Sequence, residues 1–207
     1  MRTRVKVCGI TRVEDAQAAA VHGADAIGLI FYRPSPRYVT PEQAGAIVAA
    51  TPPFVASVAV FVNPSPAEVE TVIRESGVTL LQFHGDEPPE FCSGFSRPYI
   101  KAARIRPGLD LIKYLSPHAG ARGWMLDAFH EDLWGGTGGV FDWRLVPQDA
   151  AKPIILSGGL TSENVARAVK RVRPYAVDVS TGVEASKGIK DAAKIAAFIG
   201  AVRREDS

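Results

Sequence analysis

The chain has 207 residues, of which 46% are hydrophobic and 22% charged, and its net charge is +2. This composition is ordinary for a globular protein, and so small a net charge favours neither a nucleic acid nor an anionic membrane as a partner. No apolar run approaches the roughly 18 residues of a membrane span, and no signal-peptide core follows the basic residues at positions 2, 4 and 6. We therefore expect a cytoplasmic protein.

Eight short apolar segments alternate with helical segments along the chain. Most are near-continuous apolar runs, such as AIGLIF and SVAVF, which are typical of parallel strands buried on both faces. The predicted strands are Val5–Cys8, Ala26–Phe31, Phe54–Phe61, Leu80–Phe83, Tyr99–Ala103, Gly123–Leu126, Pro153–Leu156 and Ala176–Val179.

Helix-start signals follow several of these strands. Thr11 with Glu14 fits a capping box, and residues 40–43 and 65–68 place a cap residue directly before a proline. Thr161 opens a further helical segment, and Asp191 precedes the last one. LDLIKYL is a candidate short helix, whereas residues 129–140 form a glycine-rich loop.

Eight strand–helix units in 207 residues leave about 26 residues for each unit. This spacing predicts a compact α/β fold, a single (β/α)8 TIM barrel over residues 1–207, without linkers. The alternative is a doubly wound open sheet, which favours a G-x-G-x-x-G turn after the first strand. The turn here, CGITRVED, has one glycine, so the barrel is preferred.

In a (β/α)8 barrel, functional side chains gather where strands end, and phosphate is usually bound after strands seven and eight. Residues 157–159 and 180–182 are small, flexible loops at those two places, and residues 135–139 form a third glycine cluster. These loops predict a phosphorylated ligand. The alternative is that they are turns that need a positive φ.

Cys8 and Asp127 stand at the ends of the first and sixth predicted strands. Burial disfavours the charged form of a carboxylate, so Asp127 is suited to donate a proton. A nearby cation would make Cys8 a base or a nucleophile. The alternatives are that Asp127 holds a backbone turn and that Cys8 is a small buried hydrophobe.

Two further side chains are candidates for contacts with a ligand. Arg37, in the proline-rich loop RPSPRYV, could hold a carboxylate with two hydrogen bonds, or be a surface arginine. His84 could line a pocket or anchor its own loop. Neither Cys8 nor Cys92 has metal-ligand spacing, and we expect no metal site.

Long stretches of the chain are similar to one known family. They are VKVCGITRVEDA, GADAIGLIFYRPSPRYV, LLQFHGDE, LDAFHEDLWGGTGGVFDW, LSGGLTSENV and VDVSTGVEASKGIKD, which run in order from one end of the chain to the other. Together they resemble phosphoribosylanthranilate isomerases of tryptophan biosynthesis. Two positions depart from the family pattern: Thr181 stands where a second serine is common, and Lys187 where a proline is frequent.

The resemblance implies an Amadori rearrangement of N-(5-phosphoribosyl)anthranilate to 1-(o-carboxyphenylamino)-1-deoxyribulose 5-phosphate, with no metal or organic cofactor. By the same resemblance Cys8 is the general base and Asp127 the general acid. Arg37 matches an arginine that contacts the anthranilate side of the substrate, and His84 and Asp178 are also assigned to substrate binding. The implied phosphate site consists of Gly136, Gly138, Gly158, Gly159, Ser180, Thr181 and Gly182.

Two other functions remain open at this point. A histidine-pathway isomerase shares the fold and the reaction type, but it typically has an aspartate where Cys8 stands and a two-fold internal repeat. A non-catalytic phosphate-binding barrel would keep the glycine loops without needing Cys8 and Asp127. Either monomer or homodimer is compatible with the sequence.

Overall fold

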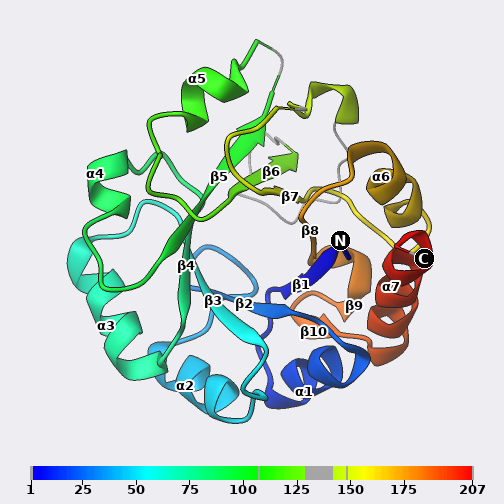
Figure 1. Ribbon diagram of the computed structural model, residues 1–207. Helices are drawn as coiled ribbons and strands as arrows, with labels where there is room; N and C mark the ends of the chain where they lie inside the picture. The colour runs from blue at the N-terminus through cyan, green and yellow to red at the C-terminus, as the bar shows by residue number, and fades with distance from the viewer. Residues whose placement is uncertain (1, 107, 129–141, 148, 207) are drawn as a thin grey trace.

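The computed structural model describes residues 2–106, 108–128, 142–147 and 149–206 of the chain. Eight parallel strands form a closed barrel in which each strand pairs with the next and β8 pairs with β1. Figure 1 shows these strands as a ring with the helices outside it. The predicted TIM barrel is confirmed.

All eight predicted strands are present, with bounds that differ by two residues or fewer. They are β1 (Arg4–Cys8), β2 (Ala26–Ile30), β3 (Ala56–Phe61), β4 (Leu80–Phe83), β5 (Tyr99–Ile105), β6 (Trp124–Ala128), β7 (Ile154–Leu156) and β8 (Ala176–Val179).

The helices outside the barrel differ greatly in length. They are α1 (Val13–His22), α2 (Pro41–Ala49), α3 (Pro66–Ser76), α4 (Pro89–Cys92), α5 (Leu111–Leu115), α6 (Val165–Val172) and α7 (Ala192–Glu205), with 3₁₀ turns η1 (Trp143–Leu145) and η2 (Thr181–Val183). The predicted glycine-rich loop at residues 129–140 lies outside the described residues. None of the helices in the described ranges is long and apolar enough to cross a bilayer.

The predicted helix starts are confirmed in part. Thr40 and Ser65 form complete capping boxes at α2 and α3, each followed by a proline. The box predicted at Thr11 is wrong, because α1 begins only at Val13 and the Thr11 hydroxyl donates to the carbonyl of Gly188 instead, at 2.5 Å. A tertiary hydrogen bond to the far end of the chain has replaced the local one.

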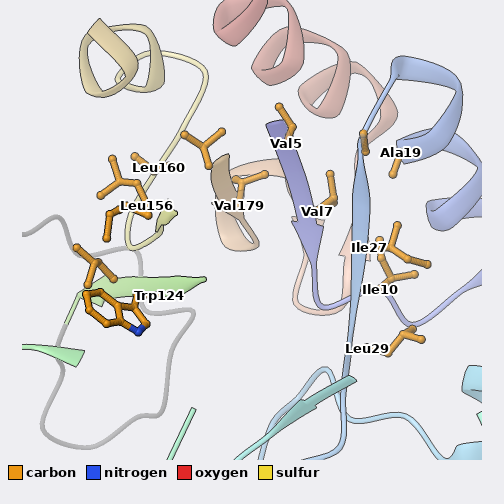
Figure 2. Packing of buried hydrophobic residues seen from close by; sticks show 14 of the residues in the cluster. Val5, Val7, Ile10, Ala19, Ile27, Leu29, Trp124, Leu156, Leu160 and Val179 are labelled. Atoms are coloured by element: carbon orange, nitrogen blue, oxygen red, sulfur yellow. The ribbon is translucent and has the colours of Figure 1, made fainter. Parts of the chain in front are cut away.

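Side chains of each strand alternate between two environments. One set packs against the surrounding helices as the main core; Figure 2 shows part of it, with Ile27 of β2 beside Ile10. The other set fills the barrel interior with a small apolar cluster that includes Ile100, Met125 and Ala176. Two residues further along β6 and β8 the same inward-facing positions hold Asp127 and Asp178, so the interior becomes polar toward the strand ends.

After β8 and η2 the chain forms a two-stranded antiparallel sheet that the sequence did not predict. It pairs β9 (Glu184–Ser186) with β10 (Ile189–Lys190) before α7 begins. Gly188, with φ +81°, makes the reversal between them. As a result Glu184 and Lys190 face one another at the carboxyl end of the barrel, where Lys190 Nζ donates to Glu184 Oε1 at 2.9 Å.

Candidate active site

A cavity of about 740 Å³, including its open mouth, lies at the carboxyl ends of the barrel strands. Every described residue that the sequence assigned to the site lines it; these are Cys8, Arg37, His84, Asp127, Gly158, Gly159, Asp178, Ser180, Thr181 and Gly182. The remaining two, Gly136 and Gly138, lie outside the described residues. The fold therefore brings residues from six different strands or their following loops into one pocket.

Asp127 is the last link of a buried hydrogen-bond chain. Gln82 Nε2 lies 3.0 Å from His84 Nδ1, and His84 Nε2 lies 3.1 Å from Asp127 Oδ2. Because an amide nitrogen only donates, Nδ1 accepts and the ring proton sits on Nε2, which donates to the carboxylate. The backbone N–H of Ala128 donates to Asp127 Oδ1 at 2.9 Å. Each carboxylate oxygen still has a second lone pair that can hold a proton for the cavity.

Cys8 lies on the other side of the cavity, at the end of β1. It is 6% exposed, and burial raises the pKa of its thiol, although the Lys6 ammonium opposes this. A Cβ added at Gly28 of β2 would lie 2.6 Å from Cys8 Sγ and 3.1 Å from Lys6 Nζ. The thiol and the ammonium therefore share the space that a side chain at position 28 would occupy.

Asp178 is held from two sides. Its Oδ1 accepts from Lys6 Nζ at 2.7 Å and its Oδ2 from Ser157 Oγ at 3.1 Å. Burial disfavours the charged form of Lys6, but the carboxylate of Asp178 and the sulfur of Cys8 together outweigh this and raise the pKa of the lysine. Both oxygens of Asp178 are thus engaged by the protein at the floor of the cavity.

Arg37 is buried and forms a two-point ion pair. Its Nε and Nη2 donate to the two carboxylate oxygens of Glu184 at 2.6 and 2.8 Å. Burial raises the pKa of Glu184, yet Arg37 and Lys190 together outweigh it, and the net shift is downward. Lys190 Nζ also donates to the backbone carbonyl of Ser180 at 3.1 Å, so this network fixes the loop after β8.

The loops after β7 and β8 approach one another through glycines. A Cβ at Gly182 would lie 2.1 Å from the carbonyl oxygen of Leu160, and Gly158 and Gly159 have φ of +88° and +60°. A Cβ at Gly158 would also lie 2.6 Å from the backbone nitrogen of Ala128. Only glycine allows this close approach of backbone to backbone, and it leaves N–H groups available to an anion.

Four residues of this site were missed by the sequence analysis: Lys6, Gln82, Glu184 and Lys190. Strand alternation could have indicated the first two, because Lys6 and Gln82 stand two residues before Cys8 and His84 on the same faces of β1 and β4. The other two meet through the β9–β10 pairing, for which the sequence offered no recognised signal.

A (β/α)8 barrel in which a thiol and a carboxyl group face one cavity beside glycine loops has the architecture of an enzyme. The family model described as N-(5'phosphoribosyl)anthranilate (PRA) isomerase matches residues 5–201. The chain therefore belongs to the phosphoribosylanthranilate isomerase family.

Individual relatives agree with this assignment. The chain is 56% identical over 206 residues to the N-(5'-phosphoribosyl)anthranilate isomerase of Dechloromonas aromatica, covering 100% of this chain and 99% of that one. It is 58% identical over 200 residues to the isomerase of Pseudomonas aeruginosa, covering 97% and 95%. The crystal structure of phosphoribosyl anthranilate isomerase from Thermotoga maritima superposes with a TM-score of 0.89 at 40% identity, covering 98% and 99%.

Proposed function

We propose that this chain catalyses the Amadori rearrangement of N-(5-phosphoribosyl)anthranilate to 1-(o-carboxyphenylamino)-1-deoxyribulose 5-phosphate in tryptophan biosynthesis, by acid–base catalysis without a cofactor. The observation that carries the proposal is the position of Cys8 and Asp127, which line one cavity from β1 and β6. A solved family member, 39% identical with a TM-score of 0.86 over 98% of this chain and 99% of its own, is described as a complex with reduced 1-(o-carboxyphenylamino)-1-deoxyribulose 5-phosphate.

Asp127 acts as the general acid in this proposal. It donates its proton to the furanose ring oxygen as the ring opens, which leaves an iminium ion at C1′. His84 and the Ala128 N–H hold the two carboxylate oxygens, at 3.1 and 2.9 Å, so the carboxyl group cannot rotate away from the cavity. The carboxylate that remains after proton transfer keeps both hydrogen bonds.

Cys8 acts as the general base. As a thiolate it removes the proton from C2′, and the electron pair of that C–H bond neutralises the iminium nitrogen to give an enolamine. The enolamine then tautomerises to the ketone. Because β1 and β6 stand apart in the barrel order, the acid and the base can act on different sides of the sugar.

The rest of the cavity fits the two ends of this substrate. The glycine loops after β7 and β8, with Ser180 and Thr181, offer N–H and hydroxyl groups to the phosphate. Ile30 and Val60 line the pocket and suit an aromatic ring. Glu184 takes two of the five N–H donors of Arg37, and the others remain able to reach the anthranilate carboxylate. His84 and Asp178 complete the substrate site.

The test is turnover of freshly generated phosphoribosylanthranilate, followed by loss of substrate fluorescence. We expect Cys8→Ala and Asp127→Asn each to lower kcat by about 10²- to 10⁴-fold, because each removes one proton-transfer group. Cys92→Ala is the matched control, since that second free cysteine is buried at the end of α4 and does not line the cavity. Near-wild-type turnover by either variant would disprove the role given to that residue.

A histidine-pathway substrate, a phosphoribosylated carboxamide, provides the second assay, and we expect no turnover of it. Binding of the phosphoribosylanthranilate without turnover by the wild-type chain would instead support a phosphate-binding barrel.

The proposal treats residues 1–207 as one barrel domain that works in the cytoplasm, where reducing conditions keep a catalytic thiol free. Its partner is a small phosphorylated substrate rather than a nucleic acid or a membrane. The chain acts as a monomer or a homodimer; one solved relative, from Thermotoga maritima, is described as a monomeric form of a dimeric isomerase, with a TM-score of 0.84 at 36% identity over 98% of this chain and 99% of its own. Sedimentation equilibrium of the purified chain distinguishes the two states.

A further inference from the structure

We propose that Lys6 is a positioning residue for this reaction: its ammonium group, held by Asp178, stabilises the thiolate form of Cys8 in a space that Gly28 leaves open. The inference rests on the base role proposed for Cys8, and it names the group that favours the thiolate, the form of the thiol that can act as a base. Lys6 itself acts through the thiol, not on the substrate.

The first support is the placement of the lysine inside the barrel. Lys6 and Cys8 are two residues apart on β1, so their side chains project to the same, inner side. Lys6 pairs in register with Asp178 of β8, and their side chains are each 6% exposed with Nζ 2.7 Å from Oδ1. A buried ion pair of this kind is seldom a gain in stability over apolar residues of the same size. The presence of the Lys6–Asp178 ion pair beside the thiol therefore indicates a role in catalysis rather than in stability.

The second support is the glycine opposite the thiol. Cys8 pairs in register with Gly28 of β2, and a Cβ at position 28 would lie 2.6 Å from the sulfur and 3.1 Å from Lys6 Nζ. It would also lie 3.1 Å from the Cα of Cys8, which is backbone and cannot move aside cheaply. Any larger residue at position 28 would separate the ammonium from the thiol.

The third support is the set of charged groups that surround the thiol, counted over every element that faces it. Burial raises the pKa of Cys8 most, and Asp178 of β8 raises it further. Lys6 lowers this pKa more than Lys190 of β10 does, and Arg37 also interacts favourably with the thiolate.

Arg37 and Lys190 are both bound to Glu184, which offsets their positive charge. Lys6 has a different geometry, because its ammonium stands near both the carboxylate of Asp178 and the sulfur. Without it, a thiolate at Cys8 would face the Asp178 carboxylate directly, and two anions would have to share a dry site.

The experiment measures the ionisation of Cys8 directly. The rate of alkylation by iodoacetamide is followed against pH by peptide mapping, in the full chain, for wild type, Lys6→Met, Lys6→Arg and Asp178→Asn. We expect the Lys6→Met midpoint to rise by about 1 to 3 pH units, because an opposite charge at close range has been removed. The Asp178→Asn midpoint moves down, because an anion has been removed, and Lys6→Arg stays closest to wild type.

Cys92 is the internal control for folding, because burial raises its pKa to about 12 and it reacts only if the chain opens. A midpoint for Cys8 that is the same in Lys6→Met as in wild type, with Cys92 protected, overturns the inference. If Lys6→Met opens the chain, Lys6→Gln decides the matter. Glutamine keeps an N–H donor for Asp178 but carries no charge, so the Cys8 midpoint rises if the ammonium stabilises the thiolate and stays at the wild-type value if Lys6 is merely structural.

A second readout separates this inference from the proposed function. The acid limb of the kcat/KM profile moves with the alkylation midpoint in Lys6→Met if Cys8 is the base. If Cys8→Ala keeps its turnover, the base role fails, yet the alkylation shift still reports on Lys6.

Discussion

The two sides of the cavity are built from different chemistry. The charged wall, formed by β1, β2, β8 and the segments that follow them, surrounds Cys8 with Lys6, Arg37, Asp178, Glu184 and Lys190. The amide wall, formed by β4 and β6, orients Asp127 with His84 and Gln82.

The difference follows from the two functional groups, the thiol of Cys8 and the carboxyl group of Asp127. A thiol has a pKa of about 8.5 in water and burial raises it, so a buried thiolate needs cations. The carboxyl group of the proposed acid must present its proton to the ring oxygen of the substrate, so it needs orientation more than it needs cations. Each wall therefore supplies what its functional group lacks.

Arg37→Met breaks the charged wall and carries the largest expected effect. Breaking a buried ion pair from one side costs about 3 to 5 kcal/mol of unfolding free energy, and Glu184 would lose one of its two cationic partners among the described residues, keeping Lys190. We also expect a large rise in KM, because the guanidinium is the proposed contact for the anthranilate carboxylate. Urea unfolding and steady-state kinetics measure the two effects.

Arg37→Lys is the matched control for that experiment. It keeps the positive charge but cannot reproduce the two parallel hydrogen bonds at 2.6 and 2.8 Å, so it should recover part of the stability and little of the KM. If Arg37→Met unfolds at the wild-type urea concentration, the Arg37–Glu184 pair does not hold the wall together.

The sequence predicted the barrel well because its signals are local. Runs such as AIGLIF mark the strands, and strand ends mark Cys8 and Asp127 without any knowledge of pairing. The ion pairs of the charged wall were missed for the opposite reason, although Arg37 and Asp178 were themselves predicted. Arg37 and Glu184 are 147 residues apart, and they meet only after the barrel has closed. The failed capping box at Thr11 has the same origin, since its partner Gly188 is 177 residues away.

His118→Phe tests the region behind the amide wall and carries the next largest effect. His118 is buried with its ring edge against Tyr99 of β5, and burial together with Lys101 lowers its pKa to about 4. Between pH 6.5 and about 4, His118 is protonated in the unfolded chain but neutral in the folded chain. The free energy of unfolding therefore falls as the pH falls through this window. Phenylalanine at position 118 keeps the ring contact with Tyr99 but has no group that titrates.

The expected change is large enough to measure. The wild-type chain should lose up to about 3 kcal/mol of stability to His118 between neutral pH and pH 4, and His118→Phe should not. Urea unfolding at several pH values measures this slope. Glu184 on the charged wall also has a lowered pKa, so its contribution is lost in a different window, below about pH 4.5. Equal slopes for the two chains between pH 6.5 and 4 would contradict the assignment.

Gln82→Leu tests the amide wall itself and carries the smallest effect. Leucine is close in size but cannot donate to His84 Nδ1, so the ring is free to move its proton to that nitrogen. The Oε1 atom of Gln82 has no partner in the described structure, so its removal costs no hydrogen bond there. We expect kcat to fall about five- to tenfold, the worth of one neutral hydrogen bond, with stability almost unchanged.

Nitrogen-15 spectra of labelled histidine decide whether the loss of activity comes from the tautomer. The chain has 4 histidines, and a His84→Asn spectrum identifies the His84 signals. Gln82→Leu should show a mixture of tautomers at His84, whereas Gln82→Glu, whose carboxylate accepts from Nδ1–H, should draw a proton to that nitrogen. If kcat falls while His84 keeps the Nε2–H tautomer, Gln82 contributes through its packing in the cavity and not through its hydrogen bond to His84. The contrast between the two walls would then rest on charge alone, because His84 would keep its proton on Nε2, facing Asp127, without a hydrogen bond from Gln82.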